Sequence, residues 1–127
     1  MTAEIIKRFS QIAWMNMALI SFKTDRKDEI DDFLIEVIDQ YSGTETRFEV
    51  RFEDTTYVRI DVDFASKRTT SDSIQSAGCR SESSWKTSLI KANPYDNFES
   101  YLDFEIGLVP KGGLMNLLAR DFTVRTL

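Results

Sequence analysis

Several segments of the chain alternate between apolar and polar residues, which is the period of a half-buried β-strand. The alternation is strict from Arg47 to Glu53 and recurs from Tyr57 to Phe64 and from Tyr101 to Val109. Two shorter apolar segments, Met17 to Phe22 and Phe122 to Arg125, are also predicted to be strands. The side chains expected to point into the core are Phe48, Val50, Phe52, Val58, Ile60, Val62, Phe64, Leu102, Phe104, Ile106 and Leu108.

Other segments repeat their apolar residues with the 3.6-residue period of an amphipathic helix. The clearest of them lies between Asp25, a suitable N-cap, and Gly43, a suitable helix stop. A first helix is predicted from Thr2 to about Met15, and a short third helix around Leu114 to Leu118. The apolar stripe of the central helix would consist of Ile30, Phe33, Leu34, Val37, Ile38 and Tyr41.

Two connections between these segments affect the expected topology. The three-residue loop Asp54 to Thr56 predicts a β-hairpin in which Phe52 lies opposite Val58, so that both apolar sets share one face. The segment from Thr69 to Asn93 is rich in Ser and Thr. Its pattern is compatible with a weak strand near Trp85 to Ile90 or with a long functional loop.

These elements together predict a single α+β domain over residues 1–127. We expect an antiparallel sheet with one face covered by two or three helices. A chain of 127 residues, of which 42% are hydrophobic, is large enough to bury a real core without a metal or a disulfide.

The chain has no His and one Cys, Cys79, and these counts exclude several kinds of chemistry. They rule out an intramolecular disulfide, Ser-His-Asp and Cys-His catalysis, and zinc sites built from several Cys and His. Arg80 next to Cys79 could favour a reactive thiolate, but an ordinary free Cys is the simpler interpretation. The N-terminal segment carries Glu4, Lys7 and Arg8, so it is typical neither of a signal peptide nor of a membrane span. We expect a cytoplasmic protein without a cofactor.

The net charge of −5 is unevenly distributed along the chain. The segment from Asp25 to Asp63 holds thirteen acids and five bases, a net charge of −8, so the rest of the chain carries +3. Such a field repels the phosphates of nucleic acids and attracts basic partners.

The acids of the predicted central helix are the main candidates for a binding surface. Like charges four residues apart on a helix cost about 0.2–0.5 kcal/mol each. The helix dipole favours acids in the first turn but not near the C-terminal end. An ordinary solvated face is the alternative interpretation. The candidate partner-binding residues are Asp28, Glu29, Asp32, Glu36 and Asp39.

Two further motifs are compatible with ligand binding. Asp61 and Asp63 would share one face of a strand, and with Glu49 on the neighbouring strand they could bind Mg²⁺ or Ca²⁺. The segment Pro110 to Gly113 precedes the predicted third helix and could hold an anion. A solvated strand face and a plain turn are the simpler interpretations, so we predict no metal site.

The leading hypothesis is a non-catalytic acidic protein that docks on a basic partner, as inhibitors and toxin-neutralising immunity proteins do. The alternative is a small-molecule-binding or enzymatic domain with a cavity lined by aromatic side chains. A third hypothesis is a homodimer formed through the sheet or the first helix. The aromatic residues of the second hypothesis are Phe48, Phe52, Tyr57, Phe64 and Phe104.

Overall fold

A computed structural model of the protein describes residues 1–41, 43, 45–61, 72–109 and 113–127. Two α-helices, one 3-10 turn and eight strands lie in these ranges. In chain order they are α1 (Thr2–Ser10), η1 (Trp14–Asn16), β1 (Met17–Lys27), β2 (Ile30–Asp39), β3 (Arg47–Glu53), β4 (Tyr57–Asp61), β5 (Asp72–Arg80), α2 (Ser84–Ala92), β6 (Leu102–Val109), β7 (Leu114–Ala119) and β8 (Asp121–Thr126).

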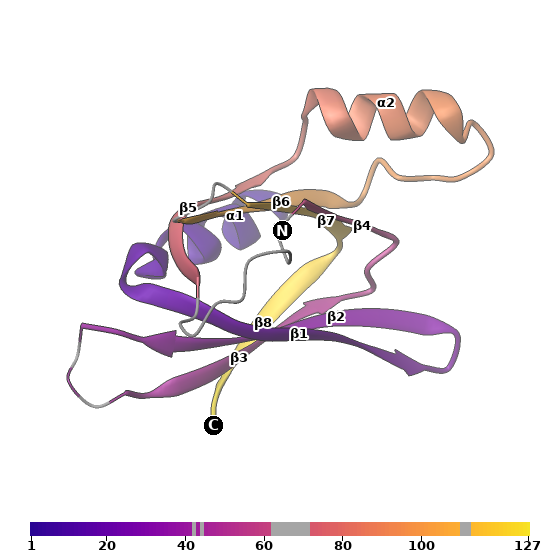
Figure 1. Cartoon of the computed structure of the whole chain (residues 1–127). Helices are drawn as coiled ribbons and strands as arrows, with labels where there is room; N and C mark the ends of the chain where they lie inside the picture. The colour runs from indigo at the N-terminus through magenta and orange to yellow at the C-terminus, as the bar shows by residue number, and fades with distance from the viewer. Residues whose placement is uncertain (42, 44, 62–71, 110–112) are drawn as a thin grey trace.

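The eight strands form one antiparallel sheet in the order β4-β7-β6-β5-β1-β2-β3-β8. Figure 1 shows this sheet folded into two layers, with β1, β2, β3 and β8 below and β4, β5, β6 and β7 above. The expectation of an α+β domain with helices covering one face of the sheet is therefore wrong. The sheet buries its inner face mainly against itself, as in a sandwich or barrel.

The two layers are joined where two long strands bend around the same corner. Arg120 alone separates β7 from β8, and three residues separate β3 from β4. Two backbone hydrogen bonds continue the pairing around the bend, from Arg120 N to Glu53 O at 3.0 Å and from Thr56 N to Leu118 O at 2.9 Å. The two ends of the strand order therefore meet, and the sheet rolls up into a flattened, barrel-like shape.

This corner corrects the predicted hairpin of residues 47–64. Phe52 pairs with Phe33 and Phe122, not with Val58, and Val58 pairs with Leu117. The alternation of β3 was predicted correctly, but alternation fixes the face of a side chain and not the partner of a strand.

Helix α1 contributes one aromatic side chain, Phe9, to the core inside the sheet. The ring of Phe9 lies 4.7 Å from that of Trp14 and 5.2 Å from those of Phe104 and Phe122. Phe9 is buried, and its carbonyl oxygen accepts a hydrogen bond of 2.8 Å from Trp14 Nε1. The helix ends at Ser10, earlier than predicted, because the chain then enters η1 and places Trp14 in the core.

The predicted central helix is wrong, because this segment forms β2. Phe33, Ile35 and Val37 point into the core from alternate positions of the strand. Leu34 lies between them on the outer face, yet it is buried too. A strand with apolar residues on both faces imitates the spacing of an amphipathic helix. The β-branched residues of the segment, which include Ile30, Ile35, Val37 and Ile38, favoured a strand.

The predicted third helix is also wrong, because residues 114–119 form β7. Every residue from Met115 to Ala119 is buried, including the polar Asn116. A strand covered on both faces shows no alternation, so its sequence cannot be told from that of a short buried helix.

The Ser- and Thr-rich segment holds β5 and α2 rather than a weak strand near residues 85–90. Figure 1 shows α2 above the upper layer. The helix belongs to residues 81–101, which connect β5 to β6 and are called the excursion below. Ser83 caps the helix, since its hydroxyl oxygen accepts a hydrogen bond of 3.0 Å from Lys86 N. Lys86 is 1% exposed, and its Nζ donates to Ser81 O at 2.7 Å and to Glu99 O at 3.0 Å. This lysine therefore ties together the two ends of the excursion.

A network of polar side chains lies between α2 and the upper layer. The buried carboxylate of Asp103 accepts hydrogen bonds of 3.3 Å from Arg80 and from Asn116. Asn116 Oδ1 in turn accepts from Arg59 Nη2 at 2.8 Å, and the Arg59 guanidinium lies 5.1 Å from the centre of the Trp85 ring. The network satisfies these buried polar groups internally, which explains why the sheet tolerates them.

Candidate functional site

The first part of the candidate site is the tip of the hairpin formed by β1 and β2. Lys27 pairs with Ile30, so Asp28 and Glu29 form a two-residue turn, with φ angles of +52° and +66°. Two successive positive φ angles are typical of a type I′ turn, for which Asn-Gly is the favoured sequence. Within the described chain, no base pairs with either carboxylate. Figure 1 shows that this tip reaches beyond the other strands of the lower layer.

Other acids near the tip are neutralised by bases of the same hairpin or of β3. Arg51 Nη1 donates to Asp32 at 2.6 Å and to Asp25 at 3.1 Å. The hydrogen bond to Asp32 is the largest contribution that raises the pKa of Arg51. Asp31 pairs with Arg26 at 3.3 Å. Residues 25–32 hold five acids and two bases, so this end of the hairpin carries a net charge of −3.

The remaining two predicted binding residues lie farther along β2. Glu36 is on the outer face, 3.8 Å from Arg47, and Asp39 ends the strand, where its Oδ1 accepts a hydrogen bond of 2.9 Å from Tyr41 N. At about 3.3 Å per residue, the eleven steps from Asp28 to Asp39 span roughly 36 Å. The five acids therefore do not form one surface. Asp28, Glu29 and Asp32 share the hairpin end, and Glu36 and Asp39 do not.

The corner of the sheet adds further acids to this end of the molecule. Burial, followed by repulsion from Asp121 and Asp32, raises the pKa of Glu53 above its ordinary value. The ionised form of Glu53 is thus disfavoured in the folded protein.

We expect Glu53→Gln to raise the melting temperature at neutral pH. A glutamate whose pKa is raised by folding lowers stability as the pH increases from its unfolded value, about 4.3, through its folded value. The gain from the substitution should accordingly shrink as the pH falls below that window. Thermal melts of both proteins between neutral and acidic pH test this prediction. A gain that persists unchanged at acidic pH would contradict it.

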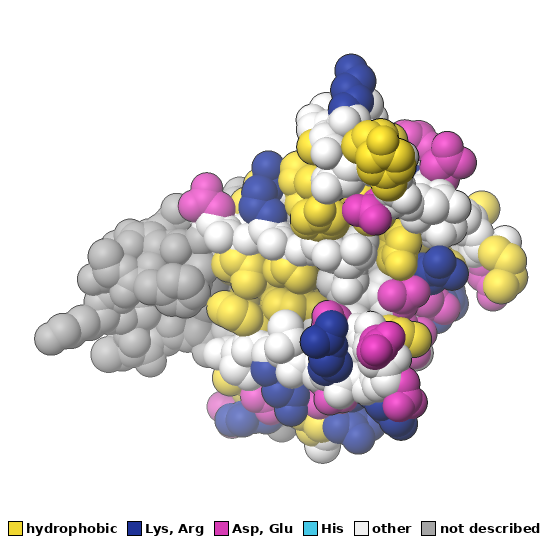
Figure 2. All heavy atoms as spheres, turned by 90° about the vertical axis from the view of Figure 1, so that its right-hand side faces the viewer, with side chains coloured by type: hydrophobic (Ala, Val, Ile, Leu, Met, Phe, Trp, Pro, Cys, Tyr) yellow, Lys and Arg dark blue, Asp and Glu magenta, His cyan; other side chains and the backbone are white. Residues whose placement is uncertain are grey.

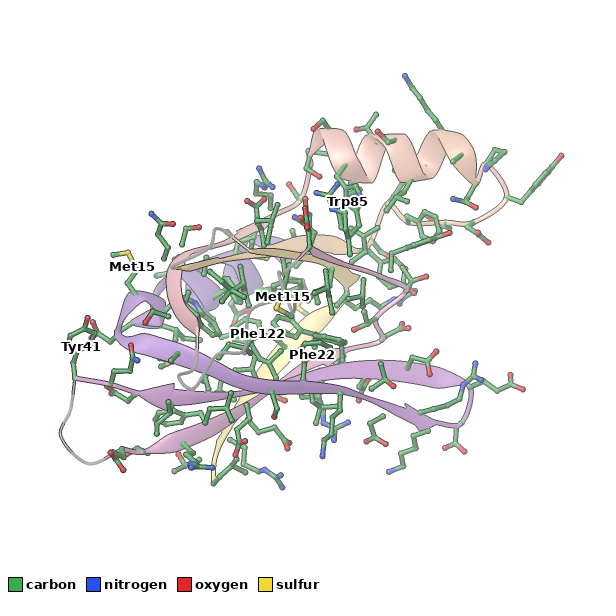
Figure 3. The ribbon with its side chains drawn as sticks, in the orientation of Figure 1. Met15, Phe22, Tyr41, Trp85, Met115 and Phe122 are labelled. Carbon is green, nitrogen blue, oxygen red and sulfur yellow. The ribbon has the colours of Figure 1, made fainter. Side chains whose placement is uncertain are left out.

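A groove lies between the hairpin and β4. It has a volume of about 220 Å³ and is lined by Thr24, Asp31, Asp32, Phe33, Thr55, Thr56 and Val58. Phe33 is buried and stacks on Phe22, with ring centres 5.9 Å apart, while Phe22 and Val58 are each 38% exposed. Figure 2, which looks onto this end, shows hydrophobic side chains between the two layers and charges of both signs along the lower layer. Figure 3 shows Phe22 pointing from β1 into the space between the layers.

Cys79 has none of the properties of a reactive thiol. It is buried, and desolvation together with the nearby Asp103 and Asp121 raises its pKa to about 12. Arg80 does not favour the thiolate, because its guanidinium is engaged by Asp103 and Glu105.

The acids considered as possible metal ligands do not come together in the part of the chain that the structure describes. Glu49 is on β3 and Asp61 on β4, and these strands are not neighbours. Asp63 lies outside the described residues, as do Pro110, Lys111 and Gly112 of the possible anion site. No cluster of three or more metal-binding side chains occurs among the described residues.

The described aromatic residues that were proposed to line a cavity pack against other side chains. The rings of Phe52 and Phe104 are 5.1 Å apart, Tyr57 packs on Phe98 at 5.4 Å, and Phe48 packs against the core. Phe64 lies outside the described residues. A different hollow, of about 440 Å³, opens between η1 and β5, and its lining includes Trp14, Met15 and Gln75. No sequence pattern indicated this hollow, because its walls come from segments about 60 residues apart.

No helix among the described residues is both long and apolar enough to cross a membrane. Comparison of the chain with protein-family models, curated proteins and solved structures found no match.

Proposed function

We propose that this protein is a non-catalytic acidic binding protein that docks on a basic protein partner through the end of its β1–β2 hairpin. The observation that carries the proposal is the pair of exposed carboxylates, Asp28 and Glu29, that no base of the described chain neutralises. A projecting, negatively charged tip attracts a basic surface over a distance of about 10 Å at ordinary salt and speeds association.

The backbone of the turn supports this proposal. Both residues adopt positive φ angles, which cost a non-glycine residue about 1–2 kcal/mol. Asp tolerates this conformation better than Glu does, and Asn-Gly would fit the turn best. Acidic side chains thus occupy positions where another sequence would give a more stable hairpin, which is expected when their charge serves binding.

The surroundings of the tip favour a protein over a small molecule as the partner. The groove beside it has a volume of about 220 Å³, below the usual size of a small-molecule pocket. Exposed apolar side chains such as Phe22, Ile30 and Val58 lie close to the charges. Apolar side chains surrounded by charged ones are typical of protein interfaces. Since Cys79 is a free buried thiol, we also propose that the protein works in a reducing compartment such as the cytoplasm.

The double variant Asp28→Asn/Glu29→Gly separates binding from folding. We expect it to raise the stability of the protein by about 1 kcal/mol, because Asn-Gly suits the turn. We also expect it to weaken capture of a basic partner from lysate of the source cell about tenfold at low salt, because two unpaired charges are lost. The measurements are urea unfolding and a quantitative pull-down at low and high salt.

Asp96→Asn/Glu99→Gln is the matched control, because it removes the same charge from the exposed segment after α2. It should leave the pull-down unchanged. Equal capture by the native protein and both variants would remove the hairpin end from the proposed function.

A further inference from the structure

We propose that the groove between the β1–β2 hairpin and β4 seats an extended basic segment of the partner, which adds to the edge of β4 that no described strand occupies. This inference rests on the proposed function and specifies the form of the partner. The site consists of the groove residues named above together with the edge of β4 and the acids of the hairpin end.

The groove arises because two paired strands separate. β2 and β3 are paired as far as Phe33 and Phe52, after which β3 turns at Asp54 and continues as β4 in the other layer. Thr55 N still donates to Asp31 O, at 2.6 Å, and beyond this bond the chains diverge. The first residues of β2 and Val58 of β4 therefore lie on opposite sides of a wedge, which forms the groove.

The edge of β4 that faces this wedge has no strand beside it in the described residues. β4 is the first strand of the sheet order, and β7 is its single neighbour there. An unpaired edge offers a row of backbone N–H and C=O groups, to which an extended peptide can add as a further strand.

The groove offers an apolar surface that every second side chain of such a peptide can contact. Phe33 forms a buried apolar floor, and Val58 is a half-exposed wall on β4. Side chains of a strand point alternately to its two faces, so every second residue of the peptide would contact this apolar surface and the others would point toward solvent.

The charge around the groove favours a positively charged occupant. Asp31 and Asp32 belong to its lining, but Arg26 and Arg51 pair with them. The excess negative charge comes from Asp28 and Glu29 at the hairpin tip, which no base of the described chain neutralises. A second copy of this chain, with its net charge of −5, would be repelled. A segment that alternates Lys or Arg with aliphatic residues matches both the apolar surface and the acidic rim.

A labelled ten-residue peptide of alternating lysine and valine is the probe, and its binding is measured by fluorescence anisotropy at low and high salt. We expect salt-sensitive binding that is lost when alternate backbone nitrogens of the peptide are methylated, because methylation removes the N–H donors needed by the strand edge. A lysine–serine peptide of the same charge should bind more weakly. Equal binding of the lysine–serine or the methylated peptide would overturn the proposal.

Val58→Asp distinguishes the groove from simple charge attraction. It removes apolar surface and adds a carboxylate, so a purely electrostatic site would bind the peptide more tightly. We expect binding about fivefold weaker, equivalent to about 1 kcal/mol. Val124→Asp on β8 is the matched control, since Val124 is similarly exposed at 43% and does not line the groove, and it should not weaken binding. Circular dichroism confirms that each variant is folded.

The groove and the proposed function fail in different ways. If the Asp28→Asn/Glu29→Gly variant loses the basic partner in the pull-down while Val58→Asp retains it and binds the peptide normally, the acidic surface stands and the groove is refuted. If the native protein binds no peptide, the groove is likewise refuted, whatever the pull-down shows.

Discussion

Replacing Phe9 by alanine is expected to destabilise the protein by about 3–5 kcal/mol, the usual cost of removing a buried aromatic side chain. Alanine is a better helix former than phenylalanine, so α1 itself would gain helix propensity. The loss therefore measures the packing of the Phe9 ring against Trp14, Phe104 and Phe122. Urea unfolding followed by tryptophan fluorescence gives the free energy of unfolding, and Trp14 reports directly on this contact.

Phe9→Leu and Lys7→Ala are the controls for this experiment. Leucine retains most of the apolar volume and should cost less than alanine does, and the exposed Lys7 should have little effect. A loss below about 1 kcal/mol for Phe9→Ala would mean that α1 is an appendage rather than part of the cooperative core.

Replacing Lys86 by methionine is expected to cost about 2–4 kcal/mol, although the substitution keeps most of the apolar stem. Methionine cannot donate the two hydrogen bonds to Ser81 O and Glu99 O, and these carbonyl oxygens would lose a charged donor in a buried site. The loss should be concentrated in the excursion that carries α2. Amide hydrogen exchange should show α2 opening more often, while β2 and β6 remain protected.

Lys91→Met is the matched control, because Lys91 lies on the same helix and is exposed. It should change the free energy of unfolding by less than about 0.5 kcal/mol. If both variants behave alike, the buried ammonium group does not hold the excursion.

The sequence predicted strands best where apolar and polar residues alternate along the strand. β3 has the predicted bounds, and Leu102, Phe104, Ile106 and Leu108 of β6 point inward as expected. It failed where apolar residues occupy both faces. Leu34 is buried on the outer face of β2, and the run from Met115 to Ala119 is buried throughout, so both segments resembled helices.

The role of the five acids in binding a partner stays a prediction, but the structure shows where they lie. Asp28, Glu29 and Asp32 do lie together at an acidic end, but they do so as a hairpin tip rather than as one face of a helix. Glu36 and Asp39 are separated from them because a strand rises about 3.3 Å per residue, more than twice the rise of a helix. Val58 and Phe33 could not be assigned to one groove from the sequence, because they meet only through the bend between β3 and β4.

The sequence by itself determined the size of the core, the faces of the alternating strands, the acidic character of the segment from Asp25 to Asp63 and the absence of histidine chemistry. These properties depend on the composition and on neighbouring residues. The tertiary structure decided which strands pair, where the sheet bends, which acids find a base and that Lys86 is buried. Each of these depends on contacts between residues far apart in the chain, whose energies a local pattern does not contain.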